Sequence, residues 1–113
     1  MTILLAGCVS VRVKDEYDEL GRLSAQNIKT GDTRSRIEYT YDEAGNLLLT
    51  HHFQYRKEGS VETVDPIEDV RYSYDEMGRC LSAVHLNGYG QVTRMCRLYY
   101  DNDDELADLE EFY

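Results

Sequence analysis

The chain has 113 residues, of which 42% are hydrophobic and 30% charged, and this composition is typical of one folded domain rather than a disordered segment. Twelve Lys and Arg residues against 22 Asp and Glu residues give a formal charge of −10, which disfavours direct contact with nucleic-acid phosphates or anionic membranes. No stretch is long and apolar enough for a spanning helix. We therefore expect a single domain over residues 1–113 that is long enough to bury a core.

The chain begins with a segment that allows two interpretations. The first is a strand over residues 3–13 of a cytoplasmic protein, because only seven residues precede Cys8 and none of them is basic. The second follows from residues 5–8, Leu-Ala-Gly-Cys, which resemble a bacterial lipobox. In that case residues 1–8 are the remnant of a signal, and the alternative location is the envelope, with a lipid anchor on Cys8.

Internal repetition is the most informative feature of the sequence. Three copies of one heptapeptide occur, and their first Tyr residues, together with that of a degenerate fourth copy, are separated by 24, 33 and 26 residues. The good copies are 17–23 (Tyr-Asp-Glu-Leu-Gly-Arg-Leu), 41–47 (Tyr-Asp-Glu-Ala-Gly-Asn-Leu) and 74–80 (Tyr-Asp-Glu-Met-Gly-Arg-Cys). The fourth copy, 100–106, has Asp104 in the Gly position.

The residue types in each copy predict a turn. The Asp begins a type I turn and accepts a backbone N–H, and the Gly three positions later adopts the left-handed conformation. A four-residue hairpin loop of this kind joins two antiparallel strands. Other turns are expected at 30–32, 56–60 and 87–90. The repeated turns then lie along one edge of a meander and the variable turns along the other.

The segments between the turns alternate as strands do. Val11 and Val13 share one face of the expected sheet and Arg12 takes the other. We predict an all-β fold, with a single antiparallel meander sheet of seven to eight strands that is strongly twisted or partly closed. Pro66 cannot donate to a ladder, so segment 64–67 is expected to be a bulge or an edge.

The C-terminal segment 101–113 contains seven acidic residues and no basic one. Within it, residues 105–113 fit either a short helix, because Leu106, Leu109 and Tyr113 fall at helical spacing, or the final strand of the repeat pattern. We favour the strand, because nine residues form a marginal helix.

The motif Tyr-Asp-Glu-Xaa-Gly-Arg/Asn-Leu is similar to the YD repeat of RHS and teneurin-type proteins. In those families long arrays form a spiralling β-sheet shell that encloses a toxin or serves as an extracellular adhesion surface. The resemblance therefore implies repeated hairpins rather than a reaction. Three or four repeats are too few to enclose anything, so we expect a stand-alone binding module.

The sequence offers few residues for chemistry. His51 and His52 are adjacent, so in a strand they point to opposite faces and do not ligate one metal. A turn at 87–89 would place Cys80 directly opposite Cys96, as a buried thiol pair or, in an oxidising compartment, a disulfide. We favour the thiol pair. No nucleotide-binding, hydrolase or metal motif is present, so we predict no enzymatic activity, no cofactor and no metal site.

The meander would align acidic residues of the repeated turns into one negatively charged ridge. They are Asp18, Glu19, Asp42, Glu43, Asp75, Glu76, Asp101, Asp103, Asp104 and Glu105. The ridge would keep the protein soluble, or it would dock a basic protein surface, because complementary charge directs association. Five basic residues would lie toward the other edge, namely Lys29, Arg34, Arg36, Arg56 and Lys57.

The preferred function is a non-catalytic binding module, such as an inhibitor or immunity-type protein that docks on a nuclease, a toxin or a nucleic-acid-binding protein. Exposed Tyr89, Tyr99 and Tyr113 are candidate anchoring residues in that interface. The alternative is an RHS-like envelope lipoprotein that binds carbohydrate or a cell-surface partner. A homodimer formed through a sheet edge is a further expectation.

Overall fold

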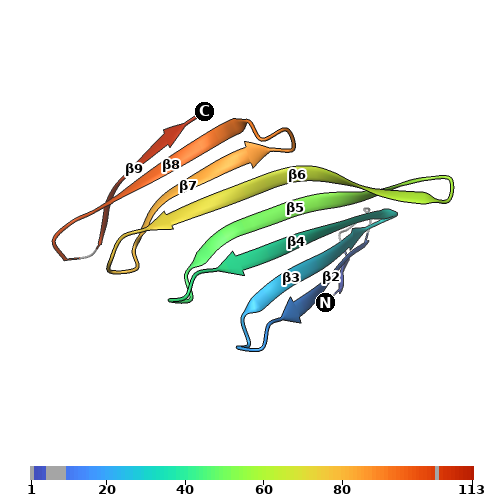
Figure 1. Ribbon diagram of the computed structural model, residues 1–113, viewed down its shortest axis with the longest axis horizontal. Coiled ribbons are helices and arrows are strands. Elements are labelled where there is room, and N and C mark those ends of the chain that lie inside the picture. The colour runs from blue at the N-terminus through green and yellow to red at the C-terminus, as the bar shows by residue number, and fades with distance from the viewer. Residues whose placement is uncertain (1, 5–9, 104) are drawn as a thin grey trace.

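The computed structural model describes residues 2–4, 10–103 and 105–113. They form one antiparallel sheet in which consecutive strands are neighbours, and they contain no helix (Figure 1). The strands are β1 (Thr2–Leu4), β2 (Ser10–Tyr17), β3 (Leu23–Thr30), β4 (Thr33–Tyr41), β5 (Leu47–Glu58), β6 (Val61–Tyr74), β7 (Cys80–Asn87), β8 (Val92–Tyr100) and β9 (Leu106–Phe112). The predicted all-β meander is confirmed, with eight longer strands and the short β1, and β1 does not pair with β9 to close the sheet.

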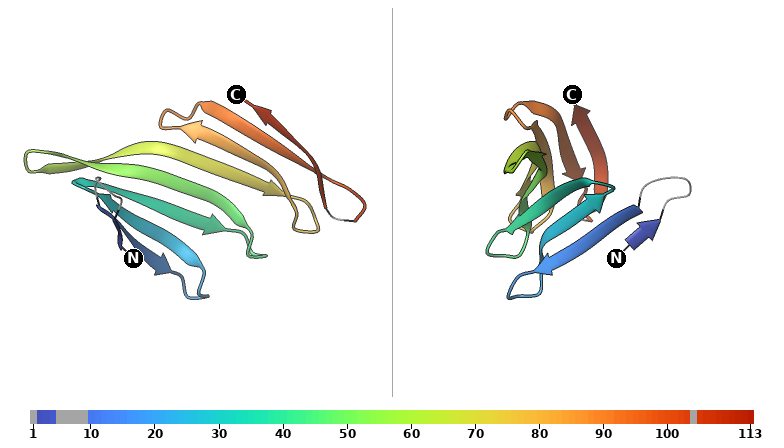
Figure 2. Two further views of the ribbon diagram at one scale, coloured as in Figure 1. Left: turned by 180° about the vertical axis from the view of Figure 1, so that it is seen from behind. Right: turned by 90° about the vertical axis from the view of Figure 1, so that its right-hand side faces the viewer.

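The sheet is extended and strongly twisted. Its radius of gyration is 17.1 Å, whereas a compact chain of this length has about 13 Å. Seen from the side, the strands at the two ends of the sheet run in clearly different directions (Figure 2). The accessible surface of 8190 Å² likewise exceeds the roughly 6,400 Å² expected for a folded protein of this mass.

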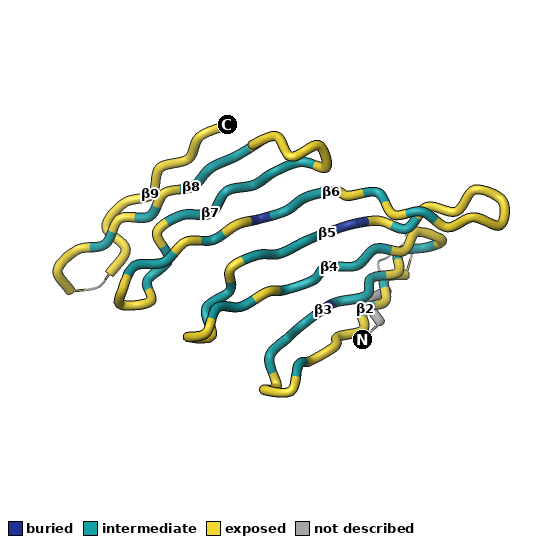
Figure 3. Tube along the Cα trace, viewed as in Figure 1, coloured by how far each residue is buried: buried dark blue, intermediate teal, exposed yellow. Residues whose placement is uncertain are grey.

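Only three hydrophobic residues of the described chain are buried, Ala25 on β3, Phe53 on β5 and Val70 on β6. Figure 3 shows the buried segments of the two central strands, β5 and β6. The core expected from the length of the chain is therefore limited, among the described residues, to these three side chains. A sheet buries a face only when a second layer covers it, and the described residues supply no second layer. Most side chains on the strands are half-buried by their cross-strand neighbours.

The register gives the two faces different characters. One face brings Tyr39, Thr50 and Val70 side by side on β4, β5 and β6. On this face Tyr39 donates a 2.5 Å hydrogen bond to Gln26, and burial raises the pKa of the Tyr39 hydroxyl. The other face is more polar, and there Arg36 bridges Glu16 at 2.6 Å from β4 to β2.

Three local predictions meet different outcomes. Pro66 lies beside a bulge, because the β5–β6 register shifts between His52 and Phe53, and it also precedes Glu68, the first β6 residue paired with β7. The C-terminal segment is a strand, β9, as favoured. The single strand predicted over 3–13 is wrong: β1 and β2 are two strands that pair with each other. Residues 5–9, including Cys8, lie outside the described part.

Candidate functional site

The turns of the four motif copies lie along one edge of the sheet, which we call the repeat rim (Figure 1). The rim comprises the connections β2–β3, β4–β5, β6–β7 and β8–β9. Their residues are 18–22, 42–46, 75–79 and 101–105. The predicted ridge residues are thus brought to one edge, except Asp104, which lies outside the described residues.

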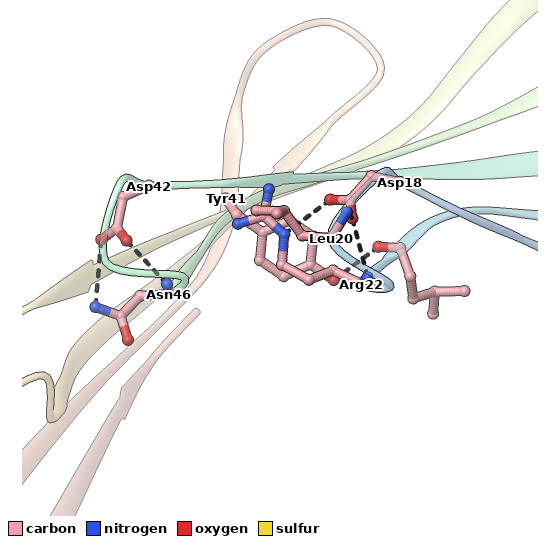
Figure 4. A network of polar contacts seen from close by, with 7 residues as sticks. Asp18, Leu20, Arg22, Tyr41, Asp42 and Asn46 are labelled. Carbon is pink, nitrogen blue, oxygen red and sulfur yellow. Dashed lines mark hydrogen bonds and ion pairs between the residues drawn. The ribbon is translucent and has the colours of Figure 1, made fainter.

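Each good copy forms its turn in the same way, and Asp18 shows how (Figure 4). Its Oδ1 accepts hydrogen bonds from the backbone N–H groups of Leu20 and Arg22, both at 2.9 Å. Gly21 follows with φ of 79°, in the left-handed region that glycine adopts without strain. The loop has five residues rather than the predicted four, because the N–H of Arg22 bonds to the carboxylate instead of pairing across the strands.

The Asp carboxylates of the rim therefore serve the turns themselves. Backbone hydrogen bonds from Arg22, Asn46 and Arg79 hold the pKa of Asp18, Asp42 and Asp75, respectively, below its usual range. Arg22 and Arg79 also bind Asp18 and Asp75 with side-chain bonds of 2.7 Å, and Asp101 accepts two backbone bonds from its own turn. The exposed carboxylates available to a partner are a smaller set: Glu19, Glu43, Glu76, Asp103 and Glu105.

Apolar side chains stand beside these outward acids. Leu20 is 77% exposed and Met77 is 68% exposed, and each follows a Glu in its turn. Ala44 occupies the same position in the second turn and is also exposed. The rim therefore presents a repeated pair of one carboxylate and one small or apolar side chain. Sequence reasoning recognised the acids and missed the apolar half of the pattern.

The Tyr that opens each copy joins successive repeats. Its hydroxyl donates to a backbone carbonyl on the strand that follows the preceding turn, where the backbone ladder to the next strand has already ended. The bonds are Tyr41 to Leu23 (2.7 Å), Tyr74 to Leu47 (2.7 Å) and Tyr100 to Cys80 (2.6 Å). The hydroxyl of Tyr17 in the first copy instead lies 3.5 Å from a carboxylate oxygen of Asp15, and Tyr17 is 63% exposed on the rim.

Where the sixth residue of the motif is Arg, it fills the gap between neighbouring turns. The guanidinium of Arg22 lies 4.6 Å from the ring centre of Tyr41, and that of Arg79 lies 5.1 Å from the ring centre of Tyr100. In the middle gap the corresponding residue is Asn46. A groove of about 630 Å³ opens there, lined among others by Tyr74.

The predicted anchoring tyrosines do not gather on the rim. Tyr99 precedes the fourth turn, whereas Tyr89 lies in the β7–β8 turn at the opposite edge. Tyr113 follows β9, which runs away from the rim, and so also lies toward the opposite edge. A shared interface of the acidic ridge with Tyr89 and Tyr113 is therefore wrong, because alternate turns of a meander lie on opposite edges.

The expected basic residues do occupy strand positions away from the rim. They are Lys29, Arg34, Arg36, Arg56 and Lys57. Several of them are neutralised locally, because Arg34 pairs with Glu62, and Arg56 with Asp65 at 3.1 Å. The edge opposite the rim therefore carries ion pairs rather than an unbroken basic strip.

The pairing predicted for Cys80 and Cys96 is wrong. Cys96 lies opposite Ala83, three positions from Cys80, and both thiols are free. The cause is the β7–β8 turn, in which Asn87 Oδ1 accepts bonds from the N–H groups of Tyr89 and Gln91, as Asp18 does in its own turn. A turn was expected at 87–90, but the sequence analysis missed that it is a fifth turn of the same type, although Asn-x-x-Gly has the spacing of Asp-x-x-Gly.

The histidines do not form a metal centre. His51 pairs with Asp69 on one face, and adjacent His52 projects from the other. Within the described residues, no group of three or more His, Cys, Asp or Glu side chains is arranged to hold a metal ion. The same residues contain no helix long and apolar enough to cross a membrane.

Comparison with known families agrees with this geometry. The RHS Repeat family model matches residues 17–56, which span the first two turns and the strands β3, β4 and most of β5. The match supports the recognition of an RHS- or YD-repeat-like protein. No curated protein matches the chain.

Proposed function

We propose that this repeat-containing chain is a non-catalytic binding module that docks on a basic protein surface through the repeat rim. The observation that carries the proposal is the alignment of the turns on one edge, with Glu19, Glu43 and Glu76 exposed in successive turns. Complementary charge increases association rates, and the exposed apolar residues beside the acids supply contact area. An inhibitor or immunity-type role toward a nuclease or toxin fits a small protein with a charge of −10.

The rim is tested with a defined basic probe, a hexa-lysine peptide, in titrations at low and high salt. The test variant carries Glu19→Gln, Glu43→Gln and Glu76→Gln. The matched control carries Asp32→Asn, Glu58→Gln and Glu62→Gln, three exposed acids toward the opposite edge. We expect weaker binding at high salt, as Debye screening requires, and a loss of affinity in the rim variant only. Equal losses of hexa-lysine affinity in both variants, or an affinity that does not change with salt concentration, would contradict the proposal.

The second candidate is an envelope protein that contacts carbohydrate or a cell-surface partner, and the RHS Repeat match favours it. Its distinguishing feature, a lipid on Cys8, falls on a residue outside the described part. Mass spectrometry of the native amino terminus separates the two functions. A diacylated Cys8 would establish the envelope candidate and overturn the cytoplasmic inhibitor.

A further inference from the structure

The rim contains three gaps between successive turns, and the chain itself fills two of them with a guanidinium group. Arg22 occupies the first gap, bonded to Asp18 at 2.7 Å and stacked over Tyr41. Arg79 occupies the third gap, bonded to Asp75 at 2.7 Å and stacked over Tyr100. A carboxylate on one side and an aromatic ring on the other thus form one recurrent guanidinium site.

The middle gap has the same two walls without the guanidinium. Asp42 is the turn carboxylate, and its Oδ2 is bonded only loosely, at 3.3 Å, by the side-chain amide of Asn46. Tyr74 is fixed by its bond to Leu47, and within the described residues no Arg or Lys side chain lies over its ring. Glu76 adds a further carboxylate to the lining of the groove.

We propose that this groove is an arginine-binding site, and that an arginine side chain of a protein partner inserts between the second and third turns. The inserted group would stack on Tyr74 and bond to Asp42, in the arrangement that Arg22 adopts in the first gap. The site thereby gives the acidic rim a point of specificity. The inference rests on the proposed function, since it names the residue type that the rim selects.

Arginine suits the groove better than lysine. A planar guanidinium stacks on an aromatic face while its edge N–H groups reach a carboxylate, whereas an ammonium group is compact and strongly hydrated. The two filled gaps of the chain hold Arg in both cases. A partner loop that presents Arg is therefore distinguished from one that presents Lys at this position.

The test titrates N-acetyl-arginine amide into the full chain and follows the ring signals of Tyr74 by NMR. They are assigned by comparison with Tyr74→Phe. We expect saturable shifts at Tyr74, with about fivefold weaker binding of N-acetyl-lysine amide. Asn46→Arg supplies the guanidinium from within the chain and should abolish the shifts, whereas Asn46→Ala leaves the groove open and should retain them.

Two results would overturn the inference: the absence of saturable shifts at Tyr74 in the wild-type chain, or shifts of equal size in folded Asn46→Arg protein. The wild-type titration tests whether arginine binds at Tyr74 even if a variant fails to fold. The hexa-lysine titration, run in the same buffer, separates this failure from that of the proposed function. Rim-dependent binding of hexa-lysine without arginine binding at Tyr74 would reject the arginine site and leave the acidic rim as the docking surface.

Discussion

The hydroxyl of Tyr74 donates a 2.7 Å hydrogen bond to the backbone carbonyl of Leu47, across the gap between the second and third turns. The β5–β6 ladder ends at Leu49 and Arg71, so the hydroxyl takes the place of the next backbone donor. Tyr41, Tyr74 and Tyr100 therefore each complete the hydrogen bonding of the repeat before their own. The motif joins repeats to one another as well as forming turns.

Removal of this hydroxyl should destabilise the sheet. We expect Tyr74→Phe to lower the free energy of unfolding by about 1 kcal/mol, because the Leu47 carbonyl loses its donor while the ring is retained. Urea titration followed by circular dichroism measures the change. Tyr89→Phe is the control, because Tyr89 is 92% exposed and should give no measurable change. Equal stability of the two variants would contradict the role assigned to the hydroxyl.

Two glycine substitutions should differ in their cost. A Cβ on Gly88 would lie 2.2 Å from the backbone oxygen of Pro66, so Gly88→Ala forces two backbone segments apart and should cost about 2 kcal/mol. Gly45 has φ of 89° with open space around it, so Gly45→Ala carries only the conformational penalty of about 1 kcal/mol. Thermal unfolding of both variants measures which loses more stability. A greater loss in Gly45→Ala than in Gly88→Ala would show that the Pro66 contact is absent.

Acid should weaken the turns. The pKa of Asp42 is lowered from 3.8, first by the backbone hydrogen bond from Asn46, so the ionised carboxylate stabilises the folded state above that value. This contribution is lost as the pH falls through the lowered pKa. Asp42→Asn keeps the side-chain oxygen acceptor without titrating. We therefore expect the stability advantage of the wild-type chain over the variant to shrink below about pH 4. If the difference in stability between the wild-type chain and Asp42→Asn stayed constant from pH 7 to pH 2, the titration of Asp42 would not be coupled to folding.

The thiols should remain separate under mild oxidation. Cys80 and Cys96 are three positions out of register, so we expect no intramolecular disulfide between them. Burial also raises the pKa of the Cys80 thiol, which leaves less thiolate to react. Alkylation by iodoacetamide at pH 8 should modify Cys80 more slowly in the folded chain than in urea, as peptide mass mapping would show. A recovered Cys80–Cys96 disulfide would contradict the register of β7 and β8.

The sequence was sufficient for features that depend on local chemistry. Asp18 and Gly21 specify a turn through hydrogen bonds within five residues. Three such turns, each placed between two alternating strand segments, predict a meander. The placement of the acidic turns on one edge followed from the same reasoning. The strand identity of β9 followed from the repeat, although its composition also fits a helix.

Features that depend on contacts between repeats were beyond the sequence. The stacking of Arg22 on Tyr41, for example, depends on how the first and second turns are placed relative to each other. The small core could not be anticipated, because apolar content does not reveal whether a second layer covers the sheet. The error at Cys96 came from the assumption that the turn comprises residues 87–89, whereas Gly90 supplies its left-handed residue.

The single-layer architecture also determines how this molecule comes apart. In the described residues every contacting pair of strands consists of sequence neighbours, and the longest pair is β5 with β6. Stability is then approximately a sum of nearest-neighbour terms, as in a one-dimensional chain of coupled units. Amide protons should exchange fastest in β9, whose residues are all exposed, and slowest in β5 and β6. The protein would thus fray inward from its C-terminal strand before the central strands unfold.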